Sequence, residues 1–172
     1  MVLPIEGQQT VPSVEAVEMM SVCAAVPAHA QRNSQGQTVM VPNLRALLHG
    51  HVGVEYYNPE RIESLTLAPP FYTYLVSCGT GALAHGTAEA FARSTALQSF
   101  DDARQIVFLE QPGHGVVVVE KWAADRAPFD LIEEALANGD LKVTSEVPQG
   151  PVEWIPAQLP DGRRVMRKKA AS

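Results

Sequence analysis

Residues 105–122 read QIVFLEQPGHGVVVVEKW, and this segment is the most informative part of the sequence about the fold. Two runs of aliphatic and β-branched residues lie on either side of Gln111-Pro112-Gly113-His114-Gly115, a sequence of turn-forming residues. Strands separated by a short glycine-containing segment are typical of a β-hairpin. We therefore expect antiparallel strands over 105–110 and 116–122, joined by a tight turn.

The sequence on both sides of this hairpin predicts short helices and strands without a regular alternation. Expected helices cover residues 13–25, 44–49, 87–97 and 128–138. Expected strands cover residues 38–41, 52–57, 62–67, 71–77, 141–147 and 152–155. Because these elements do not follow a strand–helix–strand rhythm, we expect an α+β fold, a single domain with a mostly antiparallel or mixed sheet and three to four short helices.

The composition is that of an ordinary globular protein. The chain has 172 residues, of which 46% are hydrophobic and 19% charged, enough for one domain with its own core. Its two cysteines, Cys23 and Cys78, exclude a disulfide framework and favour a reducing compartment. No stretch is long or apolar enough to span a bilayer, and residues 1–27 carry three glutamates and no basic residue, the reverse of a secretory leader. We therefore expect no membrane association and a cytoplasmic location, or a host cytosol for a delivered protein.

The charge is distributed unevenly along the chain. The net charge is −6, but residues 163–172 contain five basic residues and no acidic one, which leaves eight basic and 19 acidic residues in 1–162. An acidic body repels nucleic acid and anionic membranes, so nucleic-acid binding is not expected. We interpret the chain as a globular domain over 1–162, followed by a basic tail over 163–172 that either keeps the protein in solution or docks on an acidic surface of a protein partner.

The stretch FYTYLVSCGTGALAHGT, residues 71–87, contains the candidate chemistry. If it forms two strands joined by a tight glycine turn, His85 becomes the diagonal cross-strand neighbour of Cys78. An imidazole in that place accepts the thiol proton, and Gly79 and Gly81 let backbone N–H groups approach an oxyanion. The alternative interpretation is a buried structural cysteine beside a glycine hairpin, because free cysteine is among the most buried residue types.

The same stretch resembles the active-site segment of the cysteine glutamine deamidases, which include the cytotoxic necrotizing factor catalytic domains and the CheD chemoreceptor deamidases. The similarity lies in the aromatic and threonine-containing run 71–78, which ends at Cys78, and in residues 84–87, which contain His85. The resemblance implies that Cys78 is the nucleophile, His85 the general base and Thr73 the hydroxyl that orients the imidazole. It also implies a function, that of a Cys-His amidohydrolase that deamidates a side chain of a partner protein, as a bacterial effector does.

Two further interpretations stay open. The turn Cys78-Gly79-Thr80-Gly81-Ala82 is similar to one in the cofactor-independent amino-acid epimerases, where the thiol lies at a helix N-terminus, but Cys23 lacks the glycines that a second such cysteine requires. The other alternative is a non-enzymatic interaction or assembly protein, for example a virion or complex subunit. Many short strands and proline-rich ends fit that class, and an oligomer is then expected.

The histidines give a weaker signal. His49-Gly50-His51 together with His85 or His114 is a combination that binds zinc, but no cysteine or acidic residue lies at ligand spacing. Paired histidines in a glycine loop are more often surface residues, and the turn sequence already explains His114. We therefore expect no bound metal and no cofactor.

Overall fold

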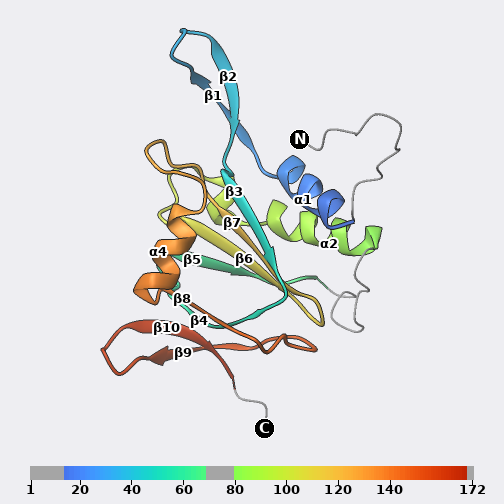
Figure 1. The fold of residues 1–172 in the computed structure, drawn as a ribbon, viewed down its shortest axis with the longest axis vertical. Helices are drawn as coiled ribbons and strands as arrows, with labels where there is room; N and C mark the ends of the chain where they lie inside the picture. The colour runs from blue at the N-terminus through green and yellow to red at the C-terminus, as the bar shows by residue number, and fades with distance from the viewer. Residues whose placement is uncertain (1–13, 69–79, 170–172) are drawn as a thin grey trace.

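The computed structural model describes residues 14–68 and 80–169, and within these ranges four helices and ten strands form a single α+β domain (Figure 1). The strands belong to three sheets, which are antiparallel except for one parallel pair. The predicted fold class, a mostly antiparallel or mixed sheet with short helices, is confirmed. The strand expected at 71–77 lies outside the described residues. None of the described helices has the length and apolar character needed to cross a membrane.

The predicted hairpin forms the centre of the main sheet. β6 (Ile106–Gln111) and β7 (Gly115–Glu120) pair antiparallel, and every residue of both strands is buried. β3 (Ala46–Gly50) pairs antiparallel with β7, and β5 (Ile62–Leu65) pairs parallel with β6, which gives the order β3-β7-β6-β5. The helix expected at 44–49 is therefore wrong, because pairing with β7 overrides the helix propensity of this leucine-containing segment.

One face of the main sheet is covered by helices (Figure 1). α1 (Val14–Ala25) confirms the helix expected at 13–25, and it packs beside α2 (Gly81–Ala92). The short α3 (Thr95–Gln98) completes the layer. Leu109 of β6 points into the core that these helices close.

The opposite face of the main sheet packs on α4 (Asp130–Asn138) and on a second sheet. Phe108 of β6 lies in this second core, with its ring centroid 5.9 Å from that of Trp154. The N-cap residue of α4 makes no side-chain capping hydrogen bond. Glu120 of β7 caps the helix instead, because its carboxylate accepts the backbone N–H of Leu131 at 3.0 Å. Adjacent residues of β6 therefore serve different cores, which is why the sheet is buried on both faces.

The second sheet contains four strands, in the order β8-β4-β10-β9. These are β8 (Leu141–Thr144), β4 (Gly53–Tyr57), β10 (Arg164–Lys168) and β9 (Trp154–Gln158). The first, second and fourth correspond to strands expected from the sequence, whereas β10 does not.

Residues 163–169 do not form the basic tail that the charge pattern predicts. β10 lies between β4 and β9, and its Val165 is 2% exposed. The charges of the strand find partners inside the molecule, since Lys168 Nζ lies 2.6 Å from Glu110 Oε1 and Arg167 pairs with Glu55. The acidic surface on which this segment docks thus belongs to the same chain.

A two-stranded hairpin projects from the body at the end opposite the second sheet (Figure 1). β1 (Ala28–Arg32) and β2 (Thr38–Pro42) pair antiparallel, and most of their residues are exposed. Asn33 closes the turn, because its side-chain oxygen accepts the backbone N–H groups of Gln35 and Gln37. The strand expected at 38–41 is confirmed.

Candidate metal centre

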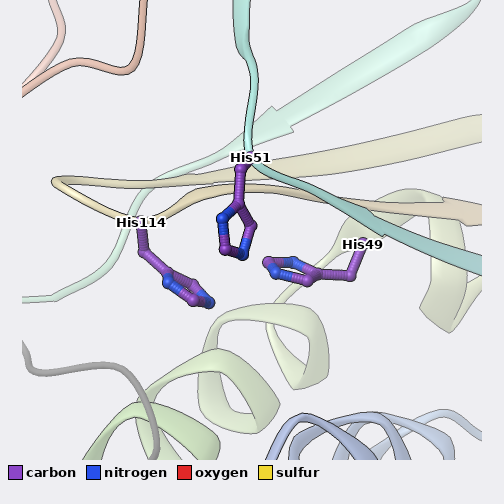
Figure 2. Close-up of side chains that lie close together, drawn as sticks. All are labelled: His49, His51 and His114. Atoms are coloured by element: carbon purple, nitrogen blue, oxygen red, sulfur yellow. The ribbon is translucent and has the colours of Figure 1, made fainter.

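Three of the five histidines meet at one corner of the main sheet (Figure 2). His49 lies in β3, His51 directly follows that strand, and His114 lies in the turn between β6 and β7. Each offers a ring nitrogen within 4.8 Å of the others. The ring centroids of His49 and His114 are 4.7 Å apart. The ring centroid of His51 lies 5.1 Å from that of His49 and 5.0 Å from that of His114.

The register between β3 and β7 brings these residues together. His49 is opposite Val117 and Gly50 is opposite Val116, so the β6–β7 turn folds back beside the end of β3. Side chains two residues apart on a strand point to the same side, which places His49 and His51 on one side of the chain. The sequence offers this combination of histidines, but no metal is expected from it, because no cysteine or acidic residue lies at ligand spacing and the histidines are interpreted as surface and turn residues.

Gly115 allows the close approach of the turn to β3. Its φ is +151°, a value that residues with a side chain rarely adopt. A Cβ atom at this position would meet the carbonyl oxygen of Gly50 well inside normal contact and would lie 3.0 Å from the Cα of His51. The glycine is therefore part of the geometry that holds His114 beside His51.

Two of the three rings have a buried nitrogen atom without a hydrogen-bond partner among the described residues. Nδ1 of His49 is 3.2 Å from the carbonyl oxygen of Val116, and a proton on Nδ1 donates to that oxygen. Nε2 of His49 then carries the lone pair. Among the described residues this atom has no hydrogen-bond partner, and neither does the buried Nε2 of His114. A backbone carbonyl that fixes the tautomer in this way is the usual support of a metal-binding histidine.

The local environment keeps His114 neutral. Burial lowers the pKa of His114, and the nearby rings of His49 and His51 lower it further, while the carboxylates of Glu18 and Glu15 partly oppose the shift. A metal ion binds the neutral imidazole, so a lowered pKa leaves the ring ready for coordination at neutral pH.

The donor set fits a transition-metal ion in number and type. Zinc binds imidazole nitrogens at about 2.0–2.1 Å in tetrahedral geometry, which puts neighbouring ligand nitrogens about 3.3 Å apart. The observed separations of up to 4.8 Å must therefore shorten. The exposed His51 has room to rotate toward the two more buried rings. Among the described residues, no Cys, Asp or Glu joins the group as a fourth ligand.

His85, the other histidine proposed as a third zinc ligand, lies elsewhere. It belongs to α2, where its side chain is 72% exposed and its Nε2 is 3.3 Å from Oε1 of Glu89. The interpretation of His49 and His51 as surface residues holds for the exposed His51, whereas His49 is partly buried. His114 lies in the β6–β7 turn as expected, but it is 6% exposed and its ring stacks on that of His49. The features of the sequence that could have indicated this histidine cluster are the His-x-His spacing of His49 and His51 and the presence of His114 in a glycine turn.

The strand–turn–strand arrangement assumed for 71–87 is wrong in its second half. Residues Gly81–Ala92 form α2, which begins six residues before the helix expected at 87–97, and Thr80 caps it by accepting the N–H of Leu83 at 3.3 Å. An alanine-rich segment after a threonine cap favours this helix. His85 is therefore not a cross-strand neighbour of Cys78.

The proposed catalytic residues Cys78 and Thr73 lie outside the described residues. The Cys-His amidohydrolase and the assembly protein therefore both stay predictions. No protein-family model, curated protein or solved structure matches the chain.

Proposed function

We propose that this protein binds a divalent transition-metal ion, zinc in the first place, through His49, His51 and His114. The observation that carries the proposal is the convergence of three histidines, each of which offers a ring nitrogen within 4.8 Å of the others. In addition, Nε2 of His49 and Nε2 of His114 are buried and have no hydrogen-bond partner among the described residues. Buried polar atoms normally have partners, so two such atoms in one histidine cluster, without a partner among the described residues, indicate a missing ligand.

The residue types narrow the choice of ion. Imidazole suits zinc, copper, nickel and iron, whereas calcium and magnesium prefer oxygen ligands. Three protein ligands leave one tetrahedral position for water, the pattern of catalytic zinc rather than of closed structural sites. A zinc ion held by His49, His51 and His114 would supply Lewis-acid chemistry to a molecule bound in that position. The exposed His51 leaves one side of the site accessible to solvent.

The test is metal binding by the full chain after treatment with a chelator. We expect isothermal titration calorimetry to give one zinc ion per chain, and Co²⁺ to give the strong visible absorption of a four-coordinate site. His49→Ala and His114→Ala should each abolish this absorption. Their matched control is the double variant His29→Ala/His85→Ala, which removes the two histidines outside the cluster and should bind as the wild type does.

Two results would overturn the proposal. One is a wild-type chain that takes up no zinc or cobalt at neutral pH. The other is equal binding by His114→Ala and by the double control, because the metal would then lie at a different place on the surface.

A further inference from the structure

A buried carboxylate near the histidine cluster has no cationic partner in the part of the chain that the structure describes. Glu18 of α1 is 1% exposed, and its Oε1 accepts a hydrogen bond from the hydroxyl of Thr87 at 2.8 Å and another from the side-chain amide of Gln111. Both donors are neutral. No lysine or arginine among the described residues forms an ion pair with Glu18.

This arrangement is unusual on electrostatic grounds. Removing a carboxylate from water is costly unless a positive charge compensates it. Two buried carboxylates of the main sheet have such compensation: Glu110 pairs with Lys168, and Glu120 accepts the N–H groups at the positive end of α4. Only neutral side chains donate the described hydrogen bonds to Glu18.

The Glu18 network is directly connected to the candidate metal centre. Gln111 is the last residue of β6, and its backbone oxygen accepts the N–H of His114 at 3.0 Å. Its side-chain amide also donates to the hydroxyl of Thr87 at 2.8 Å, while its own side-chain oxygen is buried and has no described partner. Helices α1 and α2 thereby hold the turn that presents His114, and Figure 2 shows the three rings near the ribbons of these helices.

We propose that Glu18, held by Thr87 and Gln111, is the outer-sphere carboxylate of the metal centre and supplies a negative charge that offsets part of the charge of a bound divalent cation. This inference rests on the proposed function. Glu18 acts as a positioning residue, since it contacts the β6–β7 turn through Gln111 and does not belong to the group of ligands. Carboxylates in such positions strengthen metal binding by orienting the ligands and by compensating the charge of the ion.

The variant Glu18→Gln tests the inference. It keeps an oxygen that accepts from Thr87 and Gln111 but removes the charge, and outer-sphere changes of this kind weaken metal binding by about 10–100-fold. We expect that loss in zinc affinity, together with a metal-free protein at least as resistant to heat as the wild type, because an uncompensated buried charge is gone. Glu120→Gln is the matched control: Glu120 is a buried carboxylate of β7 whose described hydrogen bonds go to α4, and its loss should leave zinc affinity unchanged.

The outcomes separate this inference from the proposed function. If the wild type binds no zinc, the proposed function fails and the inference fails with it. If the wild type binds zinc and Glu18→Gln binds it equally well, Glu18 is structural and only the inference is overturned. Should Glu18→Gln not fold, Thr87→Val takes its place: the loss of the hydroxyl donor should weaken zinc binding by up to about tenfold, and an unchanged affinity overturns the inference.

Discussion

Gly115→Ala should separate the β6–β7 turn from β3 and thereby weaken metal binding without touching a ligand. The added methyl group faces two obstacles, a φ of +151° and a carbonyl oxygen of Gly50 well inside normal contact. A residue held in such a backbone region costs on the order of 1–3 kcal/mol, and the clash adds to it. We therefore expect a loss of at least about 3 kcal/mol in the free energy of unfolding, near the upper end of single substitutions.

Gly36→Ala is the matched control for backbone strain alone. Gly36 has a φ of +75° in the exposed turn of the β1–β2 hairpin, and a Cβ atom there would meet nothing within 4 Å. The left-handed conformation costs alanine about 1–2 kcal/mol. At about 2–4 °C per kcal/mol for a chain of this size, the melting temperature should fall by about 2–8 °C in the control and by at least about 6–12 °C in Gly115→Ala.

The effect on zinc binding follows from the same strain. In Gly115→Ala the turn moves away from β3 to relieve the clash, and a bound ion must pull it back. If pulling the turn back restores about 1.4 kcal/mol of strain energy, the free energy of zinc binding is weaker by that amount and the zinc affinity falls about tenfold. Differential scanning calorimetry and zinc titration on both variants give the two quantities. Equal zinc affinity in Gly115→Ala and Gly36→Ala would refute the claim that this close approach positions His114.

Three other predictions concern protonation, the second sheet and the thiol. Burial and the neighbouring imidazoles lower the pKa of His114 from its ordinary value of 6.5, so the unfolded chain binds more protons near that pH. The free energy of unfolding of the metal-free protein should therefore fall as the pH drops below about 6.5 and level off above it. Urea unfolding between pH 5 and 8 should show a weaker dependence of this free energy on pH in His114→Gln, and the same dependence in both proteins would contradict the lowered pKa of His114. A chain ending at Gly162 lacks β10 and the burial of Val165, so its melting temperature should be lower by more than about 5 °C at low and high salt alike. An unchanged melting curve would show that the strand does not contribute to the stability of the fold. If the Cys-His amidohydrolase hypothesis holds, iodoacetamide should alkylate Cys78 at pH 6–7 much faster than the exposed Cys23, and His85→Ala should slow the reaction at Cys78. Mass spectrometry measures both rates, and equal rates at the two cysteines would mark Cys78 as an ordinary thiol.

The sequence was a good guide wherever local pattern and tertiary environment agree. The hairpin 105–122 was predictable because two β-branched runs flank a turn sequence, and both strands lie where the pattern puts them. The helix expected at 44–49 failed because its leucines suit a helix as well as a strand, and only pairing with β7, some 70 residues later, decides between them.

The candidate metal centre shows why a site is harder to predict than a fold. His49 and His51 were visible as a pair, but their third member depends on the register of β3 against β7, which no local pattern fixes. The segment 163–169 failed for a related reason. Its charges indicate a solvated tail, and the carboxylates that neutralise them, on Glu110 and Glu55, are distant in the sequence.

The position of β10 has a consequence for the order in which the molecule can assemble. β4 pairs with β10 through Tyr57 and Met166, which are 109 residues apart in the chain. During synthesis the β6–β7 hairpin and helices α1 to α3 emerge well before β10. Until β10 is made, one edge of β4 has no partner strand and Glu110 has no ion pair with Lys168. Contacts of such long sequence separation slow folding, and unpaired edges invite association with other chains. The second sheet should therefore be the last part of the protein to form, and the stage at which a nascent chain most needs protection from aggregation.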